Sequence, residues 1–395
     1  MSTLTNTIAE NRKLFNRVLL IVAAALLLLW LGPIVAEQRS YRLVQSVVTG
    51  LLVGGIYALI ALGIVIINKA SGVFNFAHGW LMLLGGLIFF SFFSTTSVNP
   101  VAAIGLPLIT GAMIFTTNGW HSLREPRSLA GIAAVAVVGA ILLLLPGTDW
   151  QFVRAIAGAV IGGVLVGMLV ERFNIRPLIG QPLFAMVLMT LAVSELLHGI
   201  TQLTWGSVEI PLQVFTGLPN LGIPAQIRFG DEIFERPINV RADLLVAFIL
   251  ALLAFAVFVA FFQFTSAGLS MRATAENQKL AQSVGLRVRT ILAVAWAIAA
   301  LLATAAGVLQ GGATSLSLNM PFLALRAFPA VLLGGLESVG GALVGGLVIG
   351  LVQELSNLLF PGTEAGTELA PYVVLMVVLI IRPDGLCGQK RIERI

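Results

Sequence analysis

Residues 268–289 read GLSMRATAENQKLAQSVGLRVR, a polar, basic, helix-favouring stretch that separates two long apolar runs, near 243–264 and 290–312. One face of this stretch carries small or mild side chains: Met271, Thr274, Ala275, Gln278, Ala281 and Ser283. Such a face is neither a core stripe nor a lipid-binding stripe, so we expect it to contact another, soluble protein. The alternative is an ordinary loop in water.

The composition around this stretch is that of a membrane protein. Of the 395 residues, 58% are hydrophobic and only 10% are charged, and the mean hydropathy is +0.99. A soluble domain carries about 25% charged residues. Runs of about 20 apolar residues span a hydrocarbon core of about 30 Å as helices. The sequence therefore predicts an all-α, polytopic membrane helix bundle with about 10–12 transmembrane helices.

The predicted helices are read directly from the apolar runs. They lie near 18–35, 45–67, 78–94, 100–117, 129–146, 154–170, 183–203, 243–264, 290–312, 322–336, 341–360 and 370–382. Lysine and arginine flank alternate connections, which places residues 268–289 and both termini in the cytoplasm. The net charge of +5 has the same explanation and requires no nucleic acid. The polar loop from Trp205 to Asp243 then lies outside.

Residues 1–44 are expected to form an N-terminal extension with one apolar helix, and the transmembrane domain is expected over 45–395. The helix at 18–35 follows Arg12-Lys13 and Arg17, and Ile34-Val35-Ala36 could end a signal peptide. We favour an uncleaved anchor, because polytopic proteins seldom need a removable signal.

Two further blocks interrupt the apolar pattern. A helix is expected to end at Asn68-Lys69, and the next to open at Asn75-Phe-Ala-His-Gly79. These polar residues either line a cavity or form a capped turn in which His78 faces solvent. The run from Pro329 to Leu336 is too short to cross alone and predicts a broken helix near 322–336.

Glycines at four-residue spacing follow the broken helix, in the pairs Gly341/Gly345 and Gly346/Gly350. Such pairs let helix backbones approach closely. They occur beside transport pathways and also at plain packing seams, and the sequence alone does not separate the two.

Few ionisable residues interrupt the runs: Glu195 and His198 share one helix face, and Glu354 lies in another helix. Each is a candidate site residue, although Glu195 and His198 could simply pair with each other. The three histidines stand in different segments and no carboxylates are paired, so catalysis is not indicated. One cysteine and scattered histidines predict no metal or cofactor.

The chain also lacks a phosphate-binding loop of the form G-x-x-x-x-G-K-[ST]. An energy source must then be an ion gradient or a separate protein docked on the cytoplasmic face. The 268–289 stretch favours the docked protein.

Several blocks in order resemble the permeases of branched-chain amino acid ABC importers, and more narrowly their "H"-type subunit. They are Gly55–Gly63 (GIYALIALG), Asn75–Gly79, Arg272–Asn277 (RATAEN), Ala281–Gly285 (AQSVG), Leu333–Gly340 (LGGLESVG) and Arg382–Leu386 (RPDGL). The resemblance covers residue 45 to the end of the chain. It implies a translocation path and a cytoplasmic coupling segment, here residues 268–289.

The resemblance also implies partners: a second permease subunit, two ATP-binding cassette subunits at the cytoplasmic face, and a periplasmic or extracellular substrate-binding protein. The resemblance further implies that the protein is embedded in the lipid bilayer of the inner or cytoplasmic membrane of a bacterium or archaeon. Hydrolysis of ATP would take place on the separate subunits, so the chain itself is not expected to be an enzyme.

The implied roles fall on two sets of residues. Coupling to the ATPases is expected at Arg272, Glu276, Ala281 and Gly285, with Gly285 ending a short helix. The translocation path is expected near Tyr57, Asn75, His78, Gly79, Gly334, Gly335 and Glu337. A helix pair at about 100–146, with a cytoplasmic turn at 121–127, exceeds the family core and predicts an accessory element on the lipid-facing rim.

Other functions stay open. Permeases that resemble this chain carry urea, short amides or other amino acids. Substrate specificity in such importers lies largely with the binding protein, so the permease sequence does not determine the cargo. An ion-coupled secondary carrier would transport alone and follow an ion gradient. A membrane-embedded scaffold or enzyme would need a catalytic cluster that the sequence does not show.

Overall fold

The computed structural model describes residues 39–207, 209–212, 214, 224–276, 278–362 and 364–388. The predicted anchor or signal helix at 18–35 lies outside the described residues. So does the candidate cleavage site after Ala36.

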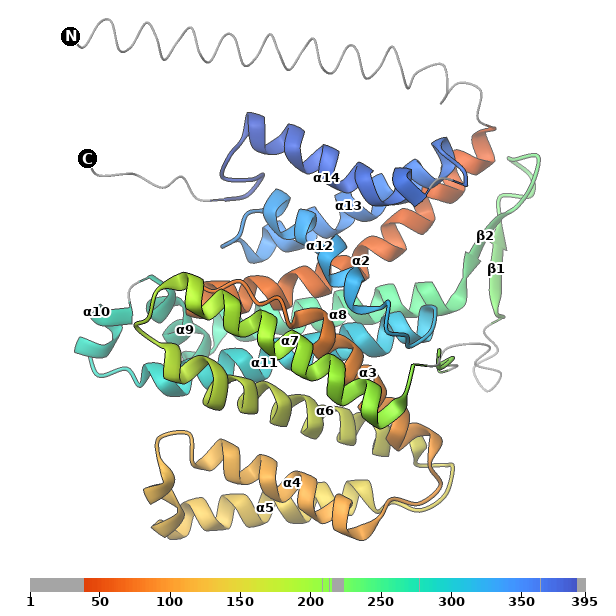
Figure 1. Ribbon diagram of the computed structural model, residues 1–395. Coiled ribbons are helices and arrows are strands. Elements are labelled where there is room, and N and C mark those ends of the chain that lie inside the picture. The colour runs from red at the N-terminus through yellow and green to blue at the C-terminus, as the bar shows by residue number, and fades with distance from the viewer. Residues whose placement is uncertain are drawn as a thin grey trace, which may run out of the picture.

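Helices make up nearly all of the described chain (Figure 1). In chain order they are α2 (Ser40–Ser71), α3 (His78–Ser94), α4 (Pro100–Phe115), η1 (Trp120–Arg124), α5 (Pro126–Leu143), α6 (Gln151–Leu169), the π-helical turn η2 (Val170–Ile175), η3 (Arg176–Leu178), α7 (Leu183–Trp205), α8 (Ala242–Phe264), α9 (Ser266–Glu276), α10 (Gln278–Ser283), α11 (Val288–Ala313), α12 (Pro321–Gly334), α13 (Val339–Leu359) and α14 (Glu364–Ile381). Every apolar run predicted between residues 45 and 382 is a helix.

The prediction of a polytopic helical membrane protein is confirmed. Among the described residues, seven helices are long and apolar enough to cross a membrane. Four shorter apolar helices accompany them: His78–Ser94, Pro100–Phe115, Pro321–Gly334 and Glu368–Ile381. Large apolar side chains cover the outer helices, for example Val257 at 62% and Leu253 at 58% exposure on α8. Such a surface is stable against lipid tails rather than water.

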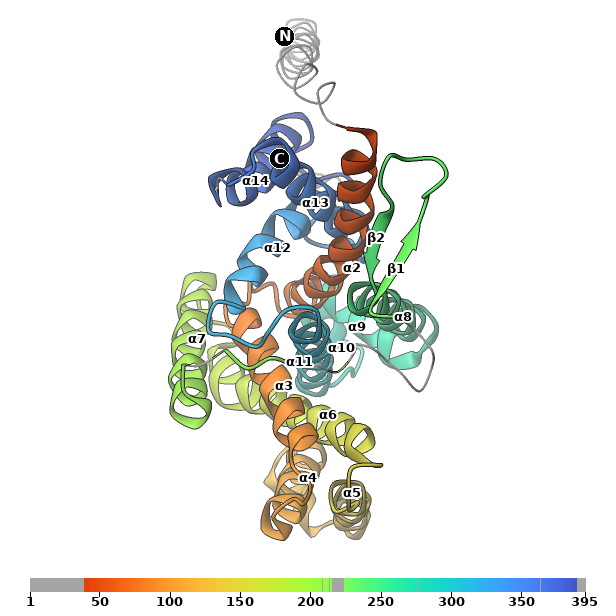
Figure 2. The same cartoon turned by 90° about the vertical axis from the view of Figure 1, so that its right-hand side faces the viewer.

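The centre of the bundle is built around α11, which packs against both α2 and α3 (Figure 2). From Ile56 to Ile67 nearly every side chain of α2 is buried, and Trp296 of α11 is fully enclosed. In a membrane this packing stabilises the fold through close van der Waals contact, since lipid tails are as apolar as leucine.

Glycines of α13 form close contacts with α2 and α12, and these contacts show the structural role of the paired glycines. Gly350 lies against α2, where an added Cβ would stand 2.5 Å from the Cα of Gly54. An added Cβ at Gly346 would overlap the backbone of Ala58. The other pair, Gly341 and Gly345, faces the backbone of α12. Both pairs are thus packing contacts between helices.

The short helix expected near 322–336 is present as α12, but Pro329 does not break it. A proline removes the hydrogen bond to the carbonyl four residues earlier, here that of Leu325. In this fold the hydroxyl of Tyr372, on α14, donates to the Leu325 carbonyl at 3.2 Å. A side chain from a helix distant in sequence therefore supplies the missing donor, and α12 continues through the proline.

The helix pair expected at about 100–146 is α4 and α5, which lie at one edge of the bundle against α6 (Figures 1 and 2). Arg154, at the start of α6, is 1% exposed and donates to four carbonyls, those of Phe92, Thr95, Leu145 and Gly147. One buried guanidinium therefore fixes the ends of α3 and α5. The pair is thus peripheral, and its placement on the lipid-facing rim stays a prediction.

The sequence analysis missed the one sheet that the described residues form. Within the polar loop between α7 and α8, β1 (Gln226–Phe229) pairs antiparallel with β2 (Ile238–Arg241). The register places Gln226 opposite Arg241 and Phe229 opposite Ile238. This hairpin stands at the right of Figure 1, and α9 and α10 stand at the opposite end of the bundle. The two polar parts of the chain are thus separated by the length of the apolar helices.

Candidate functional site

Residues 268–289, the predicted coupling segment, are mostly helical. They contain most of α9 and all of α10, and α10 ends in a Schellman motif around Gly285. The Leu286 N–H donates to the Ala281 carbonyl and the Gly285 N–H to the Gln282 carbonyl, both at 3.0 Å. Gly285 has φ +87°, a left-handed conformation that favours glycine. The predicted helix end at Gly285 is therefore confirmed.

The predicted contact face of this segment is wrong at three of its residues. Met271 is 4% exposed, Thr274 is 0% and Ala281 is 3%, whereas Ser283 of the same face is exposed. The three buried side chains pack inward, because α9 lies against α8, α11 and α2 and small residues allow that approach. The large apolar side chains exposed on the segment are Leu269 at 60%, Leu280 at 62% and Val284 at 71%, and Glu276 is exposed as well. Ala281 is thus a packing residue, and the surface available to a partner carries exposed leucine and valine.

A pocket of about 430 Å³ lies beside the coupling segment, lined by residues of α2, α8, α9 and the α12–α13 turn. Phe262, at the end of α8, contacts two cations: the Arg272 guanidinium lies 5.4 Å from its ring centroid and the Lys69 Nζ 5.5 Å. Lys69 also donates to the Glu337 carbonyl at 3.1 Å. Arg272 donates to the carbonyls of Phe262 and Gln263, which end α8. We call this group the coupling-end cluster: Lys69, Phe262, Arg272 and Glu337.

The closing block Arg382–Leu386 completes the same end of the bundle. The Leu386 N–H donates to the Leu333 carbonyl at 2.7 Å, and the Cys387 N–H donates to the Gly334 carbonyl at 3.1 Å. These carbonyls belong to the last turn of α12, which has no intrahelical donors left for them. Two blocks that are far apart in the sequence therefore form one structural unit.

A groove of about 460 Å³ opens between α7 and α12, with the start of α3 as its floor. We call it the α7–α12 groove. Phe76 and Trp80 form the floor, Leu191, Ser194, Glu195 and His198 line it from α7, and Asn319, Phe322 and Leu325 line it from α12 and the turn before it. The volume lies within the range of about 300–1,000 Å³ that small-molecule sites occupy.

Glu195 and His198 pair with each other, as their spacing suggested. The His198 Nδ1 lies 3.6 Å from a Glu195 carboxylate oxygen, and the His198 ring stacks on Trp80 with centroids 4.3 Å apart. The Glu195 side chain is nevertheless 79% exposed near the middle of α7. A charge there costs about 3 kcal/mol against lipid. This face of α7 is therefore turned toward water or another protein.

Comparison with known proteins identifies the family. Residues 127–381 match the family described as "Branched-chain amino acid transport system / permease component". The chain belongs to this family. It is 26% identical to the high-affinity branched-chain amino acid permease LivH of Salmonella typhimurium, over 91% of this chain and all of that protein. It is also 26% identical to BraD of Pseudomonas aeruginosa, over 90% of this chain and 99% of the relative. The ribose import permease RbsC of Escherichia coli is 27% identical over 74% of this chain and 84% of its own length.

The chain is thus a multi-pass membrane permease subunit of an ABC importer. Its relatives are transport permeases rather than enzymes. Among the described residues of the permease, no group of three or more His, Cys, Asp or Glu side chains is arranged to hold a metal ion.

Four residues predicted for the translocation path are buried inside the permease. Tyr57 is 2% exposed and donates to Gln353 at 2.5 Å, and His78 packs against Gly63 at 1% exposure. The Asn75 side chain accepts from the Ala77 N–H at 3.1 Å, so it does cap the turn. His78 does not face solvent, contrary to that alternative. Gly79 lies against the Pro321 backbone, directly behind the α7–α12 groove.

The other three path candidates lie elsewhere in the permease. Gly334 and Gly335 are buried at the end of α12, and Gly335 has φ +102°. Glu337 is exposed in the following turn and belongs to the coupling-end cluster. The structure thus brings Glu337 together with Arg272, which the sequence had placed in a different site. A role of these three residues along the path stays a prediction.

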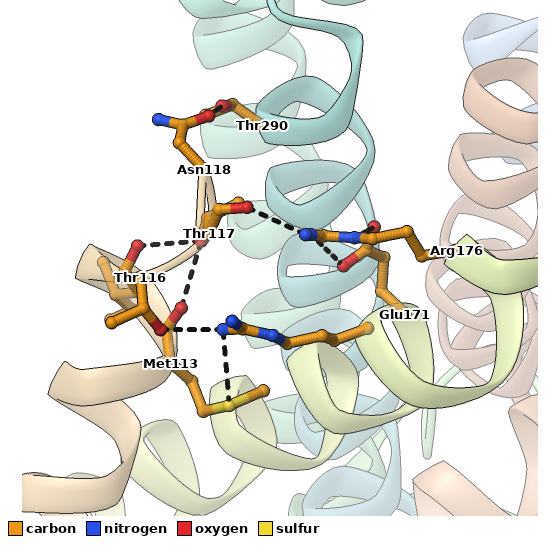
Figure 3. A network of polar contacts seen from close by, with 9 residues as sticks. Met113, Thr116, Thr117, Asn118, Glu171, Arg176 and Thr290 are labelled. Carbon is orange, nitrogen blue, oxygen red and sulfur yellow. Dashed lines mark hydrogen bonds and ion pairs between the residues drawn. The ribbon is translucent and has the colours of Figure 1, made fainter. Parts of the chain in front are cut away.

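A polar network ties the α4–α5 pair to the rest of the permease (Figure 3). Arg176 binds the buried Glu171 carboxylate with two hydrogen bonds, of 3.0 and 2.7 Å, and donates to the Thr117 carbonyl at 2.8 Å. Thr290, in the first turn of α11, donates to Asn118 at 2.8 Å. The turn after α4 is therefore held against the helix that follows the coupling segment.

Two aromatic residues at the predicted Asn75–Gly79 block form the groove floor. Phe76 lies within the block and Trp80 directly follows it, and neither was among the predicted path residues. The ring of Phe76 stacks on Phe328 of α12 at 5.4 Å. Their aromatic character could have identified both residues, because small-molecule sites are lined largely by aromatic and other apolar side chains.

Proposed function

We propose that this permease imports branched-chain or related amino acids, driven by ATP hydrolysis on two separate ATP-binding cassette subunits. A second permease subunit completes the path, and a periplasmic or extracellular binding protein delivers the cargo. The α9–α10 end faces the cytoplasm and the β1–β2 hairpin faces outward, in the inner or cytoplasmic membrane. The cargo rests on the family description and on the relatives LivH and BraD, which are branched-chain amino acid permeases.

The observation that carries this proposal is the exposed surface of the coupling segment. Leu280 on α10 and Val284 directly after it are more than half exposed, and α10 lies at the polar end of the bundle, beyond the apolar helices. Large apolar side chains gathered at a water-facing end mark a protein contact. The sequence contains no phosphate-binding loop, so an ATPase subunit is the partner that the contact fits.

A second observation supports the paired permease. The exposed face of α7 carries the ionisable Glu195 near mid-helix, and Phe322 of α12 is 55% exposed on the opposite wall of the groove. A face of this kind avoids lipid and fits a water-filled path closed by another subunit. We assign the α7–α12 face to the second permease subunit.

The contacts also provide a route from the ATPases to this face. The coupling segment contacts the end of α8 through Arg272, and Phe262 contacts Lys69, which binds the turn after α12. The other end of α12 lines the α7–α12 groove. A displacement of α9 and α10 on ATP binding would thus be carried by α12 to the groove, provided that these helices have two stable arrangements.

The test is uptake by vesicles that contain the permease, its second permease subunit and the ATPases. With a leucine-loaded binding protein outside and ATP on the ATPase side, leucine uptake is expected to depend on both and to be insensitive to ionophores. Uptake by the permease alone that follows an ion gradient would replace the proposal with a secondary carrier. Stimulation by a urea-loaded binding protein, but not by a leucine-loaded one, would keep the importer and change its cargo.

A further inference from the structure

Glu195 is an ionisable residue that packing alone does not explain. It lies near the middle of α7, and its side chain is 79% exposed although it pairs with His198. A structural ion pair in a membrane protein is normally buried in the bundle, where its charge is compensated on all sides. Here one side of the carboxylate remains open to the α7–α12 groove. The groove therefore offers a negative charge to whatever occupies it.

A side chain from the same helix connects this carboxylate to the packed core. His198 lies 3.6 Å from it and stacks on Trp80, whose side chain is 8% exposed. Trp80 belongs to α3, in the packed centre of the bundle. The connection from α3 to Glu195 thus consists of a rigid helix, a stacked ring and a side-chain contact of 3.6 Å. This connection keeps the His198 ring beside the binding group before its ligand arrives.

The remaining wall of the groove suits the rest of an amino acid. Leu191, Phe76, Phe322 and Leu325 supply an apolar surface, and Asn319 supplies an amide donor. The first backbone N–H groups of α12 already bond within their own turn, the Phe322 N–H to the Asn319 carbonyl at 3.1 Å. The Asn319 side chain is therefore the donor that this wall offers to a substrate carboxylate.

We propose that Glu195 receives the ammonium group of a zwitterionic α-amino acid in the α7–α12 groove, with the apolar side chain of the substrate against Phe76, Leu191 and Phe322. This assignment rests on the proposed function and adds to it a substrate-binding site along the translocation path. A carboxylate forms a charge-assisted hydrogen bond with an ammonium group, whereas an uncharged amide substrate needs only a neutral acceptor. The chemistry at position 195 thus separates the two classes of cargo.

The experiment compares Glu195→Gln, Glu195→Asp and wild type in the complete complex, using leucine uptake into vesicles. Glu195→Gln is expected to lower leucine uptake roughly tenfold or more, the loss of one charge-assisted hydrogen bond. Glu195→Asp keeps the charge and is expected to restore a substantial part of it. Co-purification of the ATPases and their basal hydrolysis should stay at the wild-type level in both variants.

Glu354→Gln is the matched control, because it makes the same change on α13, outside the groove. Equal loss in Glu354→Gln and Glu195→Gln would overturn the assignment, and so would full leucine uptake by Glu195→Gln. Failure of the proposed function is seen separately, as absence of ATP-dependent leucine uptake in the wild-type complex. If Glu195→Gln leaves ATP-driven acetamide uptake intact and wild type takes up no leucine, the cargo is a neutral amide and the inference fails with it.

Discussion

Leu280→Asp is expected to detach the ATPase subunits while the permease stays folded in the membrane. Leu280 is 62% exposed on α10, so the change removes little internal packing. In the proposed complex the same side chain is covered by an ATPase, and a carboxylate there would be buried without a counter-charge. Truncations at interface centres cost about 2 kcal/mol or more, and a buried charge adds to that. The amount of ATPase that co-purifies should fall by roughly thirtyfold or more.

Two further variants sharpen this prediction. Val284→Asp tests the neighbouring exposed position and should act in the same direction. Ile233→Asp is the control, since Ile233 is 80% exposed beside the β1–β2 hairpin, at the other end of the bundle. It should leave the ATPases bound. Deletion of residues 271–283 is a poorer test, because it also removes the buried Met271, Thr274 and Ala281. Normal ATPase recovery with Leu280→Asp and Val284→Asp would exclude the coupling role of α10.

Gly346→Leu is expected to prevent correct assembly of the bundle. The α carbon of Gly346 lies so close to α2 that any Cβ would overlap the backbone of Ala58. Backbone atoms cannot rotate out of the way, so the helices must separate along the seam that Gly350 and Gly54 also form. Overpacking of this kind costs about 1–3 kcal/mol or more. The yield of monodisperse protein in detergent and the melting temperature should both drop sharply.

Gly105→Leu is the matched control for this prediction. Gly105 also lies inside an apolar helix, α4, but an added Cβ there has no neighbour within 4 Å. It should leave yield and melting temperature close to those of the wild type. A Gly346→Leu protein with wild-type thermal stability would show that the α2–α13 contact is looser than described.

The helices could be predicted from the sequence because their cause is local. Each apolar run is long enough to satisfy its own backbone inside a membrane, so Ala242–Phe264 or Val288–Ala313 needs no tertiary context to be recognised. The end of α10 was equally local, since Gly285 supplies a left-handed conformation that few other residues adopt. The continuation of α12 through Pro329 could not be predicted locally. The hydrogen bond that the proline removes is replaced by the Tyr372 hydroxyl, which comes from α14.

The orientation of side chains was the harder problem. Thr274 and Ala281 resemble a water-facing surface by composition, yet small residues are also what helices need in order to pack closely. The opposite side of the segment exposes Leu280, which a rule of apolar residues inside would have buried. The assignment of Thr274 and Ala281 was reversed for one reason. Composition cannot distinguish a surface kept for a partner protein from one packed against the chain's own helices.

The candidate site shows the same division. Glu195 and His198 could be selected because ionisable residues are rare in apolar helices, and their pairing followed from the i, i+3 spacing. The groove that they share with Phe322 is formed by segments more than 100 residues apart, so no local sequence pattern predicts it. Lys69 and Glu337 likewise meet only in the folded chain.

Site-specific crosslinking from position 280 tests the central claim most directly. A photoreactive benzoyl-phenylalanine placed at Leu280 in the complete complex is expected to give a covalent product with an ATPase subunit. The same group at Ile233 should give none. A crosslink to the ATPase from position 233, or its absence from position 280 in a complex that still hydrolyses ATP in response to substrate, would contradict the account.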